Sequence, residues 1–125
     1  MSARANGGRP ARSGRPALAN WLTVRITALL LTVLVLGHFV LTHFVTDVAD
    51  TDSSFVAARW ASPLFIAWDW TMLAAAVVHG AAGLWIAIGE YAAGRRRSLL
   101  RQGLIVLSLL MIVGGTLTII RAAGL

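Results

Sequence analysis

The chain has 125 residues, of which 58% are hydrophobic, and this apolar fraction is too high for a soluble domain with so small an interior. It contains no cysteine, which excludes disulfides, thiolate metal sites and iron–sulfur clusters held by this chain. The net charge of +6 comes from 11 arginines, most of which flank apolar segments, so it does not indicate nucleic-acid binding.

Residues 1–20 are rich in Arg, Gly, Ala and Ser and contain no acidic residue. Such a segment buries too little apolar surface to order itself, so we expect a disordered basic tail. An organelle transit peptide is a less favoured interpretation, because the segment has little amphipathic pattern. Residues 21–125 are then expected to form one membrane domain.

Three apolar runs follow the tail, and each is long enough for a helix that spans a bilayer, which needs about 20 residues. The expected helices cover residues 21–45, 63–91 and 99–120. The sequence therefore predicts an all-α membrane protein with three transmembrane helices. Three helices enclose little space by themselves, so we expect the domain to pack against other chains.

The positions of the arginines predict the orientation of these helices. Four precede the first helix and four lie around the connection between the second and third: Arg4, Arg9, Arg12, Arg15, Arg95, Arg96, Arg97 and Arg101. The 46–62 connection instead carries three aspartates and a single arginine. Because positive residues concentrate on the cytoplasmic side of a membrane, we expect a cytoplasmic N-terminus and a C-terminus outside.

His79 lies within the second apolar run, where a histidine is costly without a partner and therefore indicates a functional site. A neutral imidazole is a common axial ligand of haem iron. Because helical residues advance by about 100° each, Glu90 lies on the same face. Small residues one turn from His79 leave room for a porphyrin or for a closely packed helix: Ala75, Ala76, Ala82 and Gly83. The alternative role of His79 is a hydrogen bond to a neighbouring helix.

Arg25, Glu90 and Tyr91 are expected at one membrane level, about 16 Å toward the cytoplasm from His79. A cation, a carboxylate and a phenol at one level suit a quinone head group, whose carbonyls need donors and whose reduction consumes protons. The alternative is that Arg25 reaches lipid phosphates and that Tyr91 is an interfacial aromatic residue.

His38 is expected near the depth of His79, on a face turned away from Arg25. It could ligate a second haem or hydrogen-bond another helix, and the second role is favoured. Asp69 is expected at the start of the second helix, where a carboxylate interacts favourably with the helix N-terminus. The sequence has no nucleophile–base set, phosphate loop or dinucleotide fingerprint, which argues against hydrolysis and phosphoryl transfer by this chain alone.

Three segments together resemble the small hydrophobic membrane anchor, of cytochrome b type, that belongs to succinate dehydrogenase, the quinone-reducing respiratory Complex II. They are NWLTVRITALLL, which contains Arg25, then HGAAGLW, which begins at His79, and finally the pair Glu90 and Tyr91. The resemblance covers most of residues 20–120. One departure is that Glu90 stands where the family pattern has aspartate, so its carboxylate reaches one methylene further.

The resemblance implies that the chain is half of a heterodimeric helical anchor, which shares haem b with a second membrane anchor subunit and uses His79 as one axial ligand. It implies that Tyr91 hydrogen-bonds the quinone, that Glu90 delivers protons, and that Arg25 lies near the haem propionates and the quinone pocket. An iron–sulfur subunit and a flavoprotein subunit, which hold the iron–sulfur clusters and FAD, are expected to dock on the cytoplasmic face of the bacterial plasma (inner) membrane. Electrons then pass from succinate to quinone.

Three functions are to be distinguished. The first is the electron-transfer anchor of a succinate dehydrogenase, or second to it of a fumarate reductase, with no catalysis by this chain alone. The second is a component of a small proton- or ion-coupled transporter with a path through Arg25, His38, His79 and Glu90. The third is an assembly subunit without a cofactor. Members of the family vary in haem number, so His38 is kept as a candidate second iron ligand.

Overall fold

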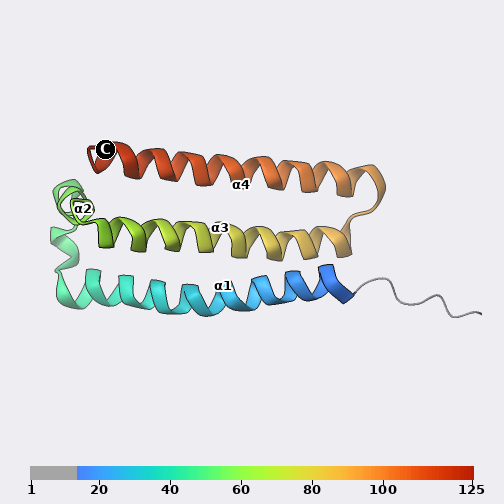
Figure 1. Ribbon diagram of the computed structural model, residues 1–125, viewed down its shortest axis with the longest axis horizontal. Coiled ribbons are helices and arrows are strands. Elements are labelled where there is room, and N and C mark those ends of the chain that lie inside the picture. Colours follow the sequence, from blue (N-terminus) through green and yellow to red (C-terminus); the bar gives the residue numbers. More distant parts are fainter. Residues whose placement is uncertain (1–13) are drawn as a thin grey trace, which may run out of the picture.

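The computed structural model describes residues 14–125, in which all regular structure is helical. Three long helices, α1 (Gly14–Val40), α3 (Pro63–Tyr91) and α4 (Gly94–Ala122), lie side by side with α3 in the middle (Figure 1). Each is long and apolar enough to cross a membrane. The prediction of an all-α protein with three helices of transmembrane length is therefore confirmed for these residues.

The first long helix begins earlier than predicted. α1 starts at Gly14, and a π-helical segment, η1 (Leu41–Val45), continues it, so residues 14–20 belong to the helix rather than to the expected tail. Pro16 is tolerated in the first turn, because the N–H that proline lacks would have no partner within the helix there. The remainder of the expected tail, residues 1–13, lies outside the described residues.

The second predicted helix has the same bounds as α3. Pro63 opens it and Ser62 precedes it, but the Ser62 side chain makes no capping hydrogen bond. Because α3 is continuous from Pro63 to Tyr91, His79 and Glu90 lie on one helix and share a face, as their spacing predicts.

The connection between α3 and α4 is shorter than predicted. Ala92 and Ala93 join the two helices, and Gly94 opens α4 with a φ of 54°, a left-handed value that favours glycine. Arg97 donates from Nε to the carbonyl oxygen of Ala92 at 2.6 Å, which satisfies a carbonyl just beyond the end of α3. The run of three arginines that was expected in a loop therefore lies in the first turn of α4.

The two ends of the helical layer carry different charges. The start of α1 and the α3–α4 connection lie at one end, and α2 (Ser53–Trp60) and the C-terminus lie at the other (Figure 1). We call the first the basic end, after Arg15, Arg95, Arg96 and Arg97, and the second the acidic end, after Asp47, Asp50 and Asp52. This separation is what the predicted orientation requires, and the orientation itself stays a prediction.

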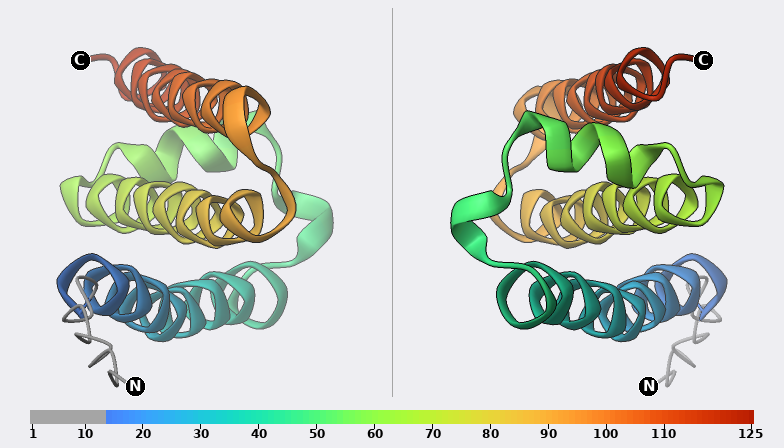
Figure 2. Two further views of the ribbon diagram at one scale, coloured as in Figure 1. Left: turned by 90° about the vertical axis from the view of Figure 1, so that its right-hand side faces the viewer. Right: turned by 90° about the vertical axis from the view of Figure 1, so that its left-hand side faces the viewer.

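The connection between α1 and α3 folds into short helices instead of an irregular loop. It contains a 3-10 helix, η2 (Val48–Asp50), followed by α2. Asp52 caps α2, because its side chain accepts hydrogen bonds from the backbone N–H groups of Ser54 and Phe55. α2 crosses the acidic end of the layer and packs on α3 and α4 (Figure 2).

Most apolar side chains face outward, because three helices in one layer enclose little volume. The buried apolar residues are Leu34, Ala75, Val77, Ala92, Leu104 and Ile119. On α4, large side chains such as Leu110, which is 64% exposed, lie on the outer surface. A surface of this kind fits lipid or partner helices rather than water.

Glycines mark the places where the helices approach most closely. A Cβ added to Gly37 on α1 would lie 2.7 Å from the Trp68 ring on α3, so Trp68 packs against α1. A Cβ on Gly115 of α4 would overlap the Leu73 side chain, whereas one on Gly114 would meet no atom within 4 Å. Of these two adjacent glycines, only Gly115 therefore lies at a close approach between helices.

Candidate functional site

His79 lies on the side of α3 that faces α1. Its Nδ1 is 3.0 Å from the hydroxyl oxygen of Thr27, and no other hydrogen bond to this ring occurs within residues 14–125. The imidazole is half-buried. The hydrogen bond to a neighbouring helix, which was the alternative role of His79, is therefore present, but it occupies only one ring nitrogen and leaves Nε2 for a ligand.

The small residues predicted around His79 are divided between two faces of α3. Ala82 lines a cavity of about 600 Å³ that is bounded by residues of α1, α3 and α4. Gly80 and Gly83 are exposed, and a Cβ on either would meet no atom within 4 Å. Ala75 is buried between the helices. Ala82 therefore borders a cavity that His79 itself does not line, and open space near His79 is present at Gly80 and Gly83.

Arg25 lies much closer to the level of His79 than predicted. The contact between Thr27 and His79 fixes the register of α1 against α3, and Arg25 is only two residues before Thr27, or about 3 Å along the axis. The expected common level with Glu90 and Tyr91 is wrong, because α1 starts well before the predicted boundary. The earlier turns of α1, and not Arg25, are level with the end of α3.

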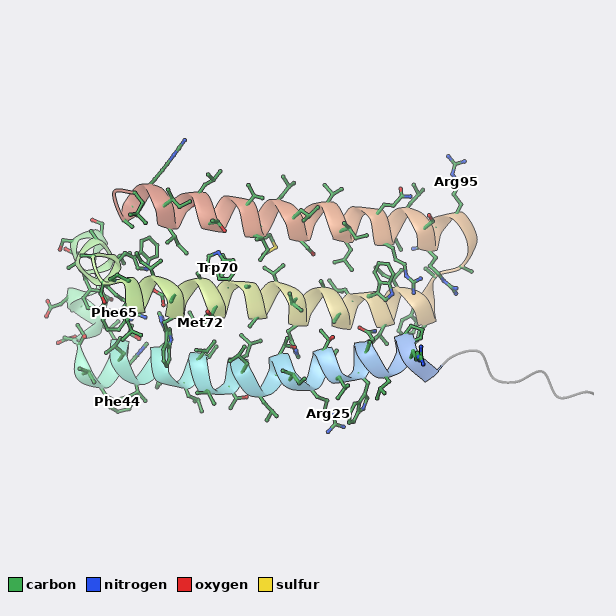
Figure 3. The ribbon with its side chains drawn as sticks, viewed as in Figure 1. Arg25, Phe44, Phe65, Trp70, Met72 and Arg95 are labelled. Carbon is green, nitrogen blue, oxygen red and sulfur yellow. The ribbon has the colours of Figure 1, made fainter. Side chains whose placement is uncertain are left out.

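The surroundings of Arg25 are positively charged. Its guanidinium lies 4.8 Å from the centroid of the Trp21 ring, and Figure 3 shows the side chain directed away from α3. Arg25 lines a cavity of about 590 Å³ together with Trp21, Trp85 and Arg101. Arg101 lies 4.3 Å from the centroid of the Trp85 ring. Two cations line this cavity and no carboxylate does, so it suits an anionic group.

Glu90 and Tyr91 end α3 at the basic end, where both are exposed and Tyr91 is 87% exposed. Tyr91 lines a cavity of about 220 Å³ together with Arg96. The predicted combination of a phenol and a cation is thus present, but the cation is Arg96 rather than Arg25. Sequence reasoning missed Arg96, because it treated the arginine run only as a sign of orientation. The available signal was that Arg96 follows Tyr91 by only five residues, across the connection between two helices.

His38 does not lie at the depth of His79. Its Nδ1 is 3.8 Å from Oδ1 of Asp69, and Asp69 precedes His79 by 10 residues, or about 15 Å along α3. The predicted depth was wrong for the same reason as the predicted level of Arg25, namely the early start of α1. The Nδ1 atom of His38 is buried and makes no hydrogen bond within the described residues.

Asp69 is the centre of a polar cluster that sequence reasoning missed. Arg59 donates to both carboxylate oxygens, from Nε at 3.2 Å and from a terminal nitrogen at 2.7 Å, and the indole N–H of Trp60 donates at 2.8 Å. Asp69 lies near the start of α3, as expected, and it is paired with the buried Arg59. We call His38, Arg59, Trp60 and Asp69 the acidic-end cluster.

No group of three or more His, Asp or Glu side chains that could hold a metal ion occurs in the part of the chain that the structure describes. A bare metal ion would need several protein ligands at one place. Haem differs, because the porphyrin supplies the in-plane nitrogens and the protein supplies only axial ligands. The donor set at His79, a single imidazole on a helix with open space at Gly80 and Gly83, fits a haem better than a bare ion.

A family model described as the succinate dehydrogenase/fumarate reductase transmembrane subunit matches residues 12–118. The match includes all of α3, with His79, Glu90 and Tyr91, and the part of α1 that carries Arg25 and Thr27. No curated protein matches the chain.

Proposed function

Because the chain belongs to the succinate dehydrogenase/fumarate reductase transmembrane subunit family, we propose that it is the membrane anchor of a succinate:quinone oxidoreductase. The observation that carries the proposal within the family is His79, whose Nδ1 is hydrogen-bonded while Nε2 stays available on a helix of transmembrane length. The chain has no catalytic role alone. It would bind and orient redox groups between soluble partners and the membrane quinone.

His79 is proposed as one axial ligand of a haem b that a second membrane anchor subunit shares. When bound, haem supplies one-electron transfer. His79 would hold it through Nε2, and the space beside Gly80 and Gly83 would accept the macrocycle. Arg25, near the level of His79, would supply positive charge to a propionate. Because Arg25 lies near the level of His79, an interaction with a haem propionate is favoured over a place in the quinone pocket.

Tyr91 and Arg96 are proposed to hold the quinone head group at the basic end. Both line one cavity, and a phenol and a guanidinium are donors that suit the two carbonyl oxygens of a quinone. Glu90 precedes Tyr91 on the last turn of α3 and would exchange the protons that quinone reduction consumes. Glu90 is exposed, so it can exchange protons with solvent.

The basic end is proposed to face the cytoplasm of a bacterial cell, because arginines concentrate on that side of the plasma membrane. An iron–sulfur subunit and a flavoprotein subunit, which hold the clusters and FAD, would dock there. A fumarate reductase anchor is the second candidate, because the family includes both complexes.

A transporter is less well supported, because its proposed path is interrupted. His38 lies about 15 Å from the level of His79, and Glu90 lies about 16 Å from it in the other direction. The Asp69 carboxylate near His38 is already paired with Arg59. We propose that His38 supports this pair and is not an iron ligand.

Mass spectrometry of the complex purified in mild detergent tests the proposed assembly. We expect this chain to co-purify with a flavoprotein, an iron–sulfur protein and a second small membrane subunit. Recovery of the chain as a homo-oligomer, from a preparation that keeps other membrane complexes intact, would contradict the proposal and favour the transporter.

The quinone site is tested by Tyr91→Phe, which removes one hydrogen-bond donor. We expect kcat/KM for quinone reduction to fall about fivefold, since such a bond contributes about 1 kcal/mol, while succinate oxidation by an artificial dye is unchanged. Arg96→Gln should act in the same direction, and Arg95→Gln is its control, because Arg95 points outward from the α3–α4 turn (Figure 3). Equal loss of both activities in Tyr91→Phe would indicate misassembly and contradict the assignment.

A further inference from the structure

We infer that Thr27 is a positioning residue that sets the tautomer of His79, so that Nδ1 carries the proton and Nε2 carries the lone pair. The inference rests on the proposed function, because its purpose is to prepare His79 for iron. It adds a second residue of α1, besides Arg25, to the proposed haem site. It follows from the hydrogen bonds of a single hydroxyl group.

The Thr27 hydroxyl has one proton and a choice of acceptors. Its oxygen lies 2.6 Å from the carbonyl oxygen of Thr23 and 3.2 Å from that of Val24, both on its own helix. A threonine inside a helix commonly donates to the carbonyl four residues earlier. The short 2.6 Å distance indicates that the proton is directed at Thr23, which leaves only lone pairs for a third partner.

That third partner is Nδ1 of His79, at 3.0 Å. Because the Thr27 oxygen can only accept there, Nδ1 must donate, and it therefore carries the ring proton. A neutral imidazole has a single N–H, so Nε2 is left with its lone pair. A metal is bound through such a lone pair, and metal-ligating histidines generally donate their other ring N–H to a fixed acceptor.

The opposite arrangement would oppose ligation. If Thr27 turned its proton toward Nδ1, the proton of His79 would move to Nε2 and occupy the position that iron needs. That arrangement also gives up the short bond to Thr23. The helix geometry of α1 thus holds His79 in the ligating tautomer before any haem is present.

The contact also fixes the direction of the imidazole ring. Thr27 is the only hydrogen-bond partner of His79 within residues 14–125, and it lies on a neighbouring helix. Loss of a partner of this kind typically lowers metal affinity by about 10- to 100-fold. A hydrogen bond at Nδ1 also makes the imidazole a stronger donor to iron, which favours the ferric state.

The test uses variants of the whole purified complex. Thr27→Val removes the hydroxyl at nearly constant volume, and Thr27→Ser keeps it. Thr32→Val is the matched control, because Thr32 on the same helix donates only to the Ala28 carbonyl. Haem dissociation into excess apomyoglobin, the electron paramagnetic resonance signal of the ferric haem and its reduction potential are measured. None of these requires turnover.

We expect Thr27→Val to release haem at least about 10-fold faster, to raise the reduction potential and to change the ferric signal. Thr27→Ser and Thr32→Val should resemble the parent complex. If Thr27→Val does not assemble, Thr27→Ala removes the hydroxyl without added bulk and is compared with Thr27→Ser. Identical haem release, potential and signal with and without the hydroxyl would overturn the inference.

His79→Ala separates this inference from the proposal on which it rests. If His79→Ala abolishes the b-type haem but loss of the Thr27 hydroxyl changes nothing, His79 is the ligand and the role of Thr27 is refuted. If His79→Ala retains an unchanged haem, the ligand assignment itself fails, and the role of Thr27 fails with it.

Discussion

Helices α1 and α3 bring a histidine to a polar partner at two places, and the two places differ in what they leave unsatisfied. Near the middle of α3, the Nδ1 atom of His79 contacts Thr27 and Nε2 has no partner in the described chain. At the acidic end, the carboxylate of Asp69 receives three hydrogen bonds from Arg59 and Trp60, and His38 lies 3.8 Å away.

This difference indicates a ligand-binding role for His79 and a structural role for the acidic-end cluster. A buried carboxylate is expensive unless it is paired, and the acidic-end cluster pairs Asp69 with Arg59 of α2, which ties α2 to α3. The contact at His79 ties α1 to α3 with one hydrogen bond and leaves a nitrogen free to bind something else. Substitutions in the acidic-end cluster should therefore mainly lower stability, and substitutions at His79 should mainly reduce cofactor binding.

The largest effect on stability is expected from Asp69→Ala, which leaves the buried guanidinium of Arg59 without its counter-ion. Removing one partner of a buried ion pair typically costs about 3–5 kcal/mol. Thermal denaturation of the purified complex should show a clearly lower midpoint. Asp50→Ala is the control, because Asp50 is exposed and lies outside the cluster. Equal midpoints for the two variants would contradict a structural role for the cluster.

A smaller loss is expected from Gly37→Ala, which places a methyl group 2.7 Å from a carbon atom of the Trp68 ring. Overpacking of this kind costs about 1–3 kcal/mol, because the ring has no flexible end that could give way. In contrast, Gly114→Ala meets no atom within 4 Å and should be neutral or slightly stabilising. The measurement is the thermal midpoint of each variant. A lower midpoint for Gly114→Ala together with an unchanged midpoint for Gly37→Ala would refute the prediction.

The smallest effect is expected at Asp52, on the exposed cap of α2. Hydrogen bonds from the Ser54 hydroxyl and from the backbone N–H of Phe55 hold the pKa of Asp52 below its ordinary value of 3.8. Because the folded pKa is the lower one, this contribution to stability is present above pH 3.8 and is lost as the pH falls through the folded value.

Asp52→Asn keeps a capping oxygen but cannot titrate, so it provides the measurement. We expect the thermal midpoint of the parent to fall more than that of Asp52→Asn as the pH drops from about 5 to about 3. Parallel curves for the two proteins would show that the Asp52 cap contributes nothing that depends on protonation.

The helices were predictable from the sequence because each rests on local information. Apolar runs of sufficient length specify the three spans, and Pro63 after Ser62 specifies the start of α3. The start of α1 was placed too late, because the basic composition of residues 1–20 as a whole was given more weight than the helix-forming alanine and leucine of residues 14–20. Because of that single error, the predicted membrane depths of Arg25 and His38 relative to α3 were wrong.

The contacts between helices could not be predicted, because they depend on register. The spacing of His79 and Glu90 follows from one helix, and it was correct. The partners Thr27 of His79 and Arg59 of Asp69 come from other helices, and no local pattern fixes their alignment. Asp69 lies inside an apolar run, and Arg59 is the single arginine of the 46–62 connection. These two positions were nevertheless a sequence signal for the ion pair between them.

The most direct test of the central claim is the absorption spectrum of two histidine variants, His79→Ala and His38→Ala, in the complex purified through a partner chain. We predict that His79→Ala loses or alters the b-type haem spectrum, while His38→Ala keeps both its spectrum and its haem content. An unchanged spectrum in His79→Ala, or a lost one in His38→Ala, would contradict the claim that His79 is the ligand and His38 a support.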